Sequence, residues 1–350
     1  MEGVWSEQDT TPARIEAGLR DLLKQRHADN GGYVPARVLN LVVVLDRQWR
    51  GEIENRLERV GRYHPSRTVM IAVEPERDQL DAWAFMVCQG NAQPGSFSVC
   101  HEHVVVEVGQ QHLRHVDTIV DPLVVSDLST VVWAPHGHRD AVEALRRLAQ
   151  VVLLDSVEEP DPHQALDRSR QLAERAYVVD LAWLRSTPWR ERIAATFDPV
   201  QWRDELRRIS AVTVHHREDS TAAGLLLLGW LATRLGWRPE RMASGAGKIR
   251  GRVRAPRGEV ALELAPDARM TVPGLAGLTI QTQSGMSLSL ERGTGGLSAT
   301  RRDRTGKESR WTVLGASRGE AGILGEGIRQ ALLREPTYRP ALAAADAMAP

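Results

Sequence analysis

The sequence predicts an α/β N-terminal domain with three layers and a mostly parallel sheet, followed by an α+β C-terminal domain with an antiparallel sheet. In the first half, near-continuous β-branched runs alternate with helical patterns, as is typical of strands buried on both faces. After residue 210, apolar and polar residues alternate, and glycine breaks of the hairpin type separate short strands. The length of 350 residues suits about two domains.

The first half begins with a helix from Thr11 to about Arg26, with Thr11 as its cap and Pro12 in its first turn. Residues 38–45 and 68–73 form two buried strands around a helix over 48–62, an order that favours a right-handed βαβ unit. Further strands are expected over 83–88, 101–108, 130–133 and 151–155, with helices over 139–150 and 163–176. Residues 112–125 should form a helix that enters a turn at Pro122 and then a short extended piece.

The second half follows a different pattern. Asp219 or Ser220 caps an apolar helix that ends at Leu235, and a last helix covers 320–333. Between them, strands are expected over 248–254, 259–265, 278–282, 287–291, 297–302 and 310–314. The sequence therefore predicts four parts: an α/β domain over 1–178, a Trp- and Arg-rich helical connector over 179–210, an antiparallel-sheet domain over 211–335, and a frayed tail over 336–350.

Composition narrows the class of protein. Hydrophobic residues make up 42% and charged residues 26%, as in ordinary globular proteins. The 45 basic and 45 acidic residues cancel, which argues against a general attraction to nucleic acid or anionic membrane. Residues 1–10 lack the apolar segment of a signal peptide, and the apolar run at 222–232 is too short to span a bilayer. Two cysteines make no disulfide framework, so we expect a cytoplasmic protein.

The motifs of common enzyme classes are missing. After the first buried strand comes Asp-Arg-Gln-Trp at 46–49, with no glycine before Gly51, so a dinucleotide site is not expected there. The segment Ser-Gly-Ala-Gly-Lys at 244–248 fails as a phosphate loop because Ile249 stands where a hydroxyl should bind magnesium. A serine hydrolase with a Gly-x-Ser-x-Gly nucleophile elbow is not expected either. We expect no enzyme activity and no cofactor.

Histidines and cysteines offer weaker alternatives. His101 and His103 share one strand face and could hold a metal, but nothing fixes a third ligand, so no metal site is expected. Cys88 and Cys100 could form a redox-sensitive pair; two small side chains packed in a sheet are the favoured interpretation.

Two clusters are candidate binding residues. Trp183, Arg185, Trp189 and Arg190 combine the residue types that dominate protein interfaces, so they are candidate partner-binding residues; packing of their helix on the first domain is the alternative. The second cluster is a candidate anion site, and turn formation at the N-terminal edge of a strand is the favoured interpretation for it. It comprises His64, Ser66 and Arg67.

A basic stripe marks the second domain. Arg250, Arg252 and Arg254 lie on one face of a strand and could bind nucleic acid or another acidic partner. Glu259 and Glu263 on the next strand can pair with them across the sheet, which is the favoured interpretation.

Several segments together resemble the glucose-6-phosphate dehydrogenase assembly protein (OpcA) family. They are Ala-Arg-Val-Leu-Asn-Leu-Val-Val at 36–43, His-Pro-Ser-Arg at 64–67, Leu-Ser-Thr-Val-Val-Trp-Ala-Pro at 128–135 and Asp-Leu-Ala-Trp-Leu-Arg-Ser-Thr-Pro-Trp-Arg-Glu at 180–191. The resemblance implies a non-catalytic assembly factor or allosteric effector whose partner is glucose-6-phosphate dehydrogenase, in the oxidative pentose phosphate pathway. Two alternatives stay open: an α/β enzyme or sensor that binds a sugar phosphate or nucleotide, and a nucleic-acid binder that uses the basic stripe.

Overall fold

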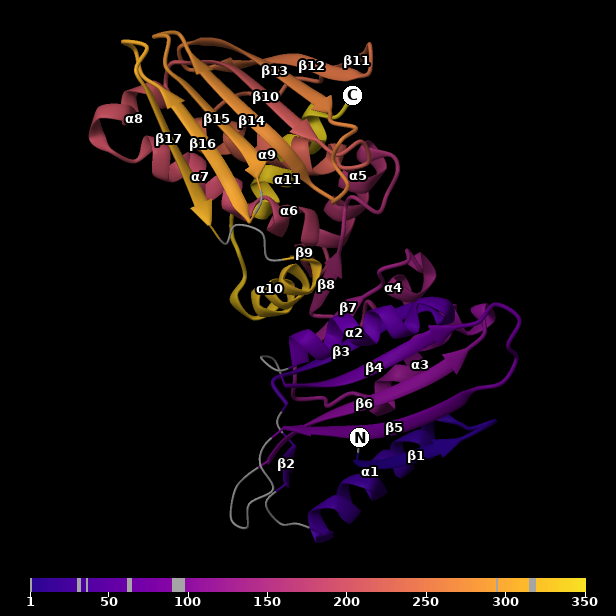
Figure 1. The fold of residues 1–350 in the computed structure, drawn as a ribbon. Coiled ribbons are helices and arrows are strands. Elements are labelled where there is room, and N and C mark those ends of the chain that lie inside the picture. The colour runs from indigo at the N-terminus through magenta and orange to yellow at the C-terminus, as the bar shows by residue number, and fades with distance from the viewer. Residues whose placement is uncertain are drawn as a thin grey trace. The chain divides into compact units, whose positions relative to one another are not determined.

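The computed structural model describes residues 2–29, 33–35, 37–61, 65–89, 98–293, 295–314 and 319–350. They form two compact units that interleave along the chain (Figure 1). Unit 1 comprises Met1–Leu154, Ala176–Val179 and Glu320–Leu333, and unit 2 comprises Asp155–Arg175, Asp180–Gly319 and Arg334–Pro350. Each unit contains one sheet, mostly parallel in unit 1 and mostly antiparallel in unit 2, which agrees with the predicted classes.

The sheet of unit 1 has the order β1-β5-β6-β4-β3-β7-β8-β9, with β2 beside β6. Its strands are β1 (Glu2–Glu7), β2 (Tyr33–Pro35), β3 (Leu39–Asp46), β4 (Ser66–Val73), β5 (Asp81–Gln89), β6 (Ser98–Val108), β7 (Thr130–Trp133), β8 (Val151–Leu154) and β9 (Tyr177–Asp180). From β6 to β9 this is the strand order 3-2-1-4-5-6 of doubly wound dinucleotide-binding sheets. Strands β3, β4, β6, β7 and β8 run parallel, whereas β5 pairs antiparallel with both β6 and β1.

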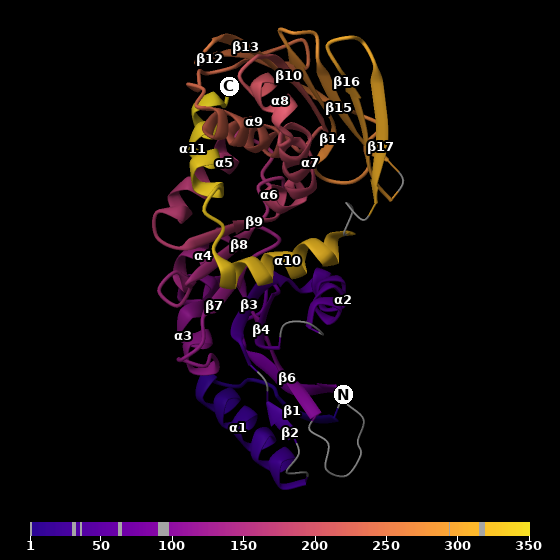
Figure 2. The ribbon, with the colours of Figure 1, turned by 90° about the vertical axis from the view of Figure 1, so that its left-hand side faces the viewer.

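Helices cover both faces of this sheet, with α2 on one face and α1 and α3 on the other (Figure 2). The helices of unit 1 are α1 (Pro12–Asp29), η1 (Arg47–Trp49), α2 (Arg50–Gly61), η2 (Gln110–His115), α3 (Val116–Val120), η3 (Asp121–Leu123), α4 (Arg139–Leu145) and α10 (Gly319–Leu333). Residues Leu39 to Leu45 of β3 are all buried, because side chains on both sides of the strand meet helices. The helix expected to run from His112 into a turn at Pro122 consists of three short helices in succession. Pro122 lies in the last of them, and Val124 beyond it is extended, because proline lacks the N–H that a continuing helix needs.

The sheet of unit 2 has the order β11-β12-β13-β10-β14-β15-β16-β17, and helices α9 and α11 lie on one side of it (Figures 1 and 2). Among the described strands of this sheet, β10 and β13 are the one pair that runs parallel. The strands are β10 (Ile209–His216), β11 (Ala243–Gly245), β12 (Lys248–Ala255), β13 (Gly258–Pro266), β14 (Leu275–Thr282), β15 (Ser287–Gly293), β16 (Gly296–Arg302) and β17 (Glu308–Leu314). The helices are α5 (Pro162–Ala173), α6 (Leu181–Arg185), α7 (Thr187–Phe197), α8 (Val200–Leu206), α9 (Thr221–Leu235) and α11 (Tyr338–Met348).

Glycine places the hairpin turns of this sheet where the sequence predicts them. Gly285 and Gly306 have φ of 86° and 85°, a left-handed conformation that side chains with a Cβ disfavour. They connect β14 to β15 and β16 to β17, which pair antiparallel.

The C-terminal residues differ from the frayed tail expected over 336–350. They form α11, whose Tyr338, Ala341, Leu342 and Met348 are buried. The alanine run is a packing surface, because small side chains let α11 approach α9 closely. A Cβ added at Gly229 of α9 would lie 2.2 Å from the carbonyl oxygen of Ala341.

No helix in the described part of the chain has the length and apolar character needed to cross a lipid bilayer.

Candidate functional site

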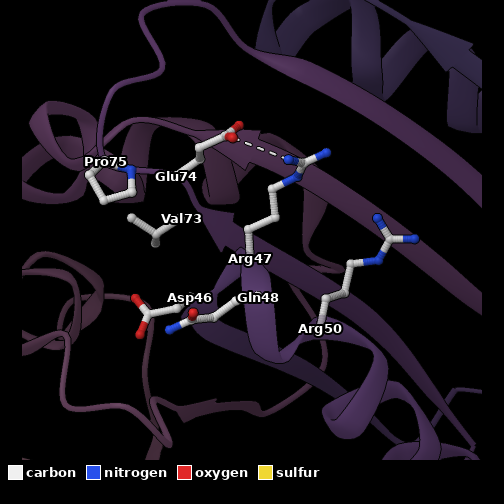
Figure 3. Close-up of a pocket in the computed structure, with 7 residues that line it drawn as sticks. All are labelled: Asp46, Arg47, Gln48, Arg50, Val73, Glu74 and Pro75. Carbon is white, nitrogen blue, oxygen red and sulfur yellow. Dashed lines mark hydrogen bonds and ion pairs between the residues drawn. The ribbon is translucent and has the colours of Figure 1, made fainter.

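The carboxyl ends of β3 and β4 form a concave surface in unit 1. Asp46 and Val73, the last residues of the two strands, are direct register partners. An open hollow of about 670 Å³ lies beside them (Figure 3). It is lined by Asp46, Arg47, Gln48, Arg50, Val73, Glu74 and Pro75. Its volume suits a small ligand, and its position is the edge where open α/β sheets bind ligands.

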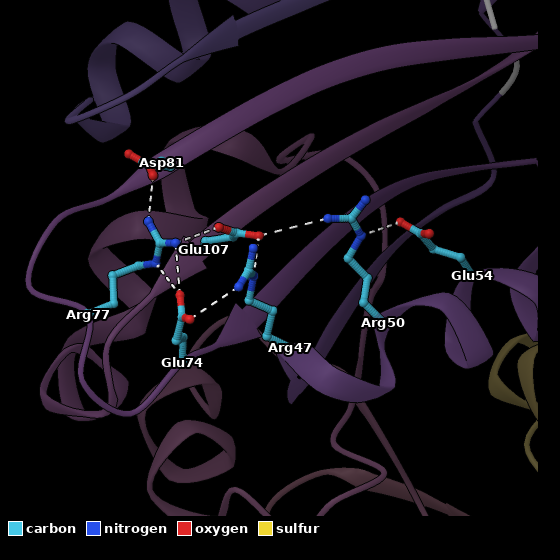
Figure 4. Close-up of polar contacts among 7 residues, drawn as sticks. All are labelled: Arg47, Arg50, Glu54, Glu74, Arg77, Asp81 and Glu107. Carbon is cyan, nitrogen blue, oxygen red and sulfur yellow. Dashed lines mark hydrogen bonds and ion pairs between the residues drawn. The ribbon is translucent and has the colours of Figure 1, made fainter.

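The guanidinium groups at this edge are already paired with carboxylates (Figure 4). Glu107, buried at the end of β6, accepts a hydrogen bond from Arg47 Nε at 2.8 Å, and Arg77 Nη2 lies 2.8 Å from its other oxygen. Glu74 pairs with the same two arginines, at 3.1 Å and 2.8 Å. Arg50 lies between Glu107, at 3.8 Å, and Glu54, at 2.9 Å. We call these residues, with Asp81, the carboxyl-edge network.

This network changes the chemistry of the hollow. The hydrogen bond that Arg47 donates to Glu107, together with the negative charge of Glu107, holds the pKa of Arg47 above its ordinary value. A second hollow of about 660 Å³, lined by residues 74–79, adds Glu76 and Asp78. The two linings together contain four carboxylates and three guanidiniums. A phosphate group would therefore have to displace existing ion pairs and approach an acidic surface, which disfavours binding of an anion.

A second polar cluster lies where β3 and β7 end, at the point where the strand order reverses direction. His138 Nε2 is 3.1 Å from Asp46 Oδ1, and the rings of Trp49 and His136 are 5.8 Å apart. Burial lowers the pKa of His136 and of His138. Both imidazoles are therefore neutral at pH 7. Within the part of the chain that the structure describes, no group of three or more His, Cys, Asp or Glu side chains could hold a metal ion.

The histidines of β6 pack against the sheet. The ring of His103 stacks on Phe85, with centroids 5.0 Å apart and planes 4° from parallel. Burial, with the nearby His101, lowers the pKa of His103 to about 4. The two cysteines that the sequence singles out are direct register partners across the antiparallel pair of β5 and β6.

The four candidate partner-binding residues come together inside unit 2. Trp183 and Trp189 are 2% and 1% exposed. The guanidinium of Arg190 lies 3.5 Å from the centre of the Trp183 ring, and burial lowers its pKa to about 10. Arg185 is buried in a bidentate ion pair with Asp155: Nη1 donates to Oδ1 at 2.8 Å and Nη2 donates to Oδ2 at 2.6 Å. This Trp/Arg cluster is thus part of the core here, and its contact with a partner stays a prediction.

A buried acid accompanies the Trp/Arg cluster. Asp180 caps α6 by accepting the N–H of Ala182, accepts the N–H of Ser156, and accepts the hydroxyl of Tyr338 at 3.1 Å. Burial and the charge of Asp155 raise its pKa to about 6. Trp183 Nε1 donates to Glu335 at 3.1 Å, so two side chains near the C-terminus hold the start of α6.

The candidate anion site lies at the other edge of the unit 1 sheet. His64 lies outside the described residues. Ser66 is buried, with its hydroxyl 3.2 Å from that of Thr68. Arg67 donates to Glu102, which is fully buried, at 2.5 Å, and to the carbonyl of Leu123 at 3.1 Å. These contacts suit a structural role, and anion binding here stays a prediction.

The basic stripe is paired across the sheet. Arg250 Nε and Lys248 Nζ both lie 2.7 Å from Glu263, and Arg252 lies 3.1 Å from Glu259. Arg250 is the direct register partner of Glu263, whereas Arg252 is opposite Ala261 and reaches Glu259 diagonally. The stripe therefore has the opposite-charge neighbours that the favoured interpretation predicts.

A second group of tryptophan and arginine side chains, half-buried in unit 2, was not predicted from the sequence. Arg301 of β16 lies 4.5 Å from the ring centre of Trp202 on α8 and 5.9 Å from that of Trp311 on β17. Both indole rings are half-buried. Trp202 lies 99 positions before Arg301 and 109 before Trp311, so no sequence motif joins it to them. The antiparallel pairing of β16 with β17 could have suggested that Arg301 lies near Trp311.

The carboxyl-edge network was also missed from the sequence, although a signal for it was present. Asp46 ends β3, Glu74 follows β4, and Glu107 is the residue before the last of β6. Acidic residues at the ends of three buried strands were a usable signal for a polar cluster at one sheet edge.

Comparison with known proteins places the chain in a family. The model described as the glucose-6-phosphate dehydrogenase subunit N-terminal domain matches residues 58–171, and that of the subunit's C-terminal domain matches residues 176–342. A relative in Synechococcus elongatus, named as OxPP cycle protein OpcA, is 27% identical over 185 residues, which cover 51% of this chain and 42% of that protein. Its counterpart in Nostoc punctiforme is 27% identical over 181 residues, covering 50% and 39%. The matches thus span less than half the length of these relatives.

Solved structures resemble the chain only distantly. A WlbA (WbpB) dehydrogenase from Thermus thermophilus gives a TM-score of 0.43 at 13% identity, covering 88% of this chain and 94% of that one. Myo-inositol dehydrogenase from Lactobacillus casei gives 0.45 at 11% identity, covering 89% and 93%. Scores this low carry no argument about fold or function. The two family models, in contrast, together match most of the chain, the N-terminal domain before the C-terminal domain. This confirms the predicted resemblance: the chain belongs to the glucose-6-phosphate dehydrogenase subunit (OpcA) family.

Proposed function

We propose that this chain is a cytoplasmic, non-catalytic protein that binds glucose-6-phosphate dehydrogenase and modulates it, in the oxidative pentose phosphate pathway. The observation that carries this proposal is the match of both family models, which together extend over parts of both units. Their descriptions name a subunit of that enzyme.

The chemistry of the carboxyl edge supports a non-catalytic role. Arg47 and Arg77 are paired with Glu74 and Glu107, so their charges are balanced within the protein. A catalytic or phosphate-binding arginine needs its charge available for the substrate.

The proposed mechanism is a shift of populations. A protein that binds one conformation or oligomer of the enzyme more tightly than another favours that state by the difference in binding free energy. A tenfold preference supplies about 1.4 kcal/mol. Assembly and allosteric activation are therefore two outcomes of the same differential binding.

The test is to purify the chain with the dehydrogenase of its own organism. We expect a stable complex on size-exclusion chromatography and a changed kcat/KM or oligomer distribution of the enzyme. No complex together with unchanged kinetics, at micromolar concentrations of both proteins, would contradict the proposal.

A second candidate is a sensor of a sugar phosphate or nucleotide, because the hollow at the ends of β3 and β4 has the size and sheet edge of a ligand site, although a phosphate there would have to displace the ion pairs of Arg47. A ligand at 100 times its Kd should stabilise the protein by about 2.7 kcal/mol. Thermal unfolding with glucose 6-phosphate, NADP and nucleotides tests this. A true ligand should lose its effect in the variant Arg47→Gln and keep it in Arg252→Gln, a matched control in unit 2.

A further inference from the structure

A half-exposed stack of aromatic and guanidinium groups lies at one side of unit 2. The side chain of Arg301 lies close to the rings of Trp202 and Trp311, at 4.5 Å and 5.9 Å from their centres. Cation–π contact fixes the three side chains, so they lose little entropy when a partner covers them. Trp and Arg are the residue types most enriched among interface hot spots. Unlike the buried Trp/Arg cluster, this stack is half-exposed.

The stack lies beside an edge strand. Within the described residues, β17 is the last strand of the unit 2 sheet and pairs only with β16. An edge strand presents backbone N–H and C=O groups that can pair with a strand from another protein. At the opposite edge, β11 has three residues, whereas β17 has seven. The longer edge offers more backbone pairing to an added strand.

The charge of this hairpin sets the chemistry of its partner. Residues 301–310 contain five basic and two acidic side chains, a net charge of +3 in a chain whose net charge is zero. The five are Arg301, Arg302, Arg304, Lys307 and Arg310, and the two are Asp303 and Glu308.

Little of this positive charge is cancelled on the side of β17. Glu308 is shared between Arg302 at 2.8 Å and Arg310 at 3.0 Å. The side chain of Arg310 is 77% exposed. Arg304 is the exception, because it pairs with the buried Glu205. The exposed edge therefore attracts a segment that carries carboxylates.

We propose that β17, with the stack of Trp202, Arg301 and Trp311, is the docking surface for an extended, acidic segment of the dehydrogenase, which adds a strand beside β17. The identity of this partner rests on the proposed function. Single-stranded nucleic acid fits less well, because Arg301 lies over the indole of Trp202 on which a base would stack.

The test measures the affinity of the dehydrogenase for the wild-type chain and for the variants Arg310→Glu and Trp311→Ala. Each variant should weaken binding about tenfold or more, as expected for loss of a complementary charge or an aromatic anchor. The matched control is Arg252→Glu on β12, whose side chain is 74% exposed and is also paired with a glutamate. It should bind as the wild type does. Unfolding midpoints check that each variant folds. If Trp311→Ala does not fold, the affinity of Arg310→Glu alone decides the test.

The outcomes separate the two proposals. If the wild type binds and both variants bind equally well, the docking surface is wrong and the proposed function stands. If the wild type does not bind the dehydrogenase at all, both fail. A single-stranded oligonucleotide is the third arm. If it binds the wild type, binds Arg310→Glu more weakly and displaces the enzyme, the surface belongs to nucleic acid and the protein partner is refuted.

Discussion

At the residue scale, Asp180 is the most informative single group. It accepts three hydrogen bonds inside unit 2, yet its pKa is raised to about 6 because burial and the charge of Asp155 outweigh those bonds. The ordinary value is 3.8. The folded protein therefore binds this proton more tightly than the unfolded chain does. Its contribution to stability is fully present below pH 4 and is lost as the pH rises through about 6.

We predict that Asp180→Asn removes this loss. The amide can still accept from Ser156 and Ala182, and it carries no charge. Between pH 4 and pH 7 the variant should gain up to about 3 kcal/mol relative to the wild type, because about two pH units correspond to that energy. Urea unfolding across this range, followed by tryptophan fluorescence, measures it. Asp198→Asn, at a side chain 80% exposed, is the control. Parallel curves for Asp180→Asn and the wild type would refute the assignment.

The ion pair of Arg185 and Asp155 gives a second prediction at this scale. Both side chains are nearly inaccessible, at 7% and 5% exposure. Removing one partner leaves a buried charge, so Arg185→Met should destabilise the protein by about 3–5 kcal/mol. Removing both charges in Arg185→Met with Asp155→Leu should cost much less than the sum of the single changes. A double-mutant cycle of urea unfolding tests this, and additive effects would contradict it.

At the scale of elements, the contact of α9 with α11 depends on one glycine. A Cβ at Gly229 would lie 2.2 Å from the Ala341 oxygen and 2.9 Å from the Ala345 nitrogen, both backbone atoms. A Cβ at Gly224, five residues earlier on α9, would meet only side chains: that of Leu264 at 2.9 Å and that of His216 at 3.6 Å. A side chain can move aside, whereas a helix backbone has to shift as a whole.

These two glycines form a matched pair for mutation. Gly229→Ala should destabilise by about 1–3 kcal/mol, because the two helices must separate. Gly224→Ala should be close to neutral, because the better helix propensity of alanine, about 1 kcal/mol, offsets the displacement of Leu264. Thermal unfolding compares them. Equal midpoints would show that α11 does not pack as described.

Sequence patterns predicted most elements but not their lateral partners. The run at 38–45 predicted a strand buried on both faces, and β3 (Leu39–Asp46) is one. The helix expected to run from His112 into a turn at Pro122 consists of three short helices in succession, and Val124 beyond Pro122 is extended, as expected. The alanine run at the C-terminus lacked an amphipathic pattern, so its packing against Gly229, more than 100 positions earlier, could not be predicted from local periodicity.

At the scale of the whole molecule, unit 2 collects segments from separate parts of the chain. Its α5 and α11 lie outside the antiparallel-sheet domain predicted over 211–335, yet both contact α9. We predict that a fragment of residues 155–350 unfolds cooperatively, because it holds every segment of unit 2. A fragment of residues 211–335 should not, because α9 would expose its apolar surface. Circular dichroism and urea unfolding of the two fragments measure this, and cooperative unfolding of the shorter one would support the boundaries predicted from sequence.

From the sequence alone came the classes of the two sheets, the hairpin turns, the lack of a glycine-rich dinucleotide loop after the first buried strand, and the family. These depend on residue periodicity, glycine positions and segment order, which are local along the chain. Only the folded structure decided that Trp183 and Trp189 face inward, and that Arg47 is neutralised by Glu74 and Glu107. Burial and charge pairing depend on neighbours 27 to 152 positions away, as with Arg47 and Glu74 or Trp183 and Glu335, and no local pattern records such distant contacts.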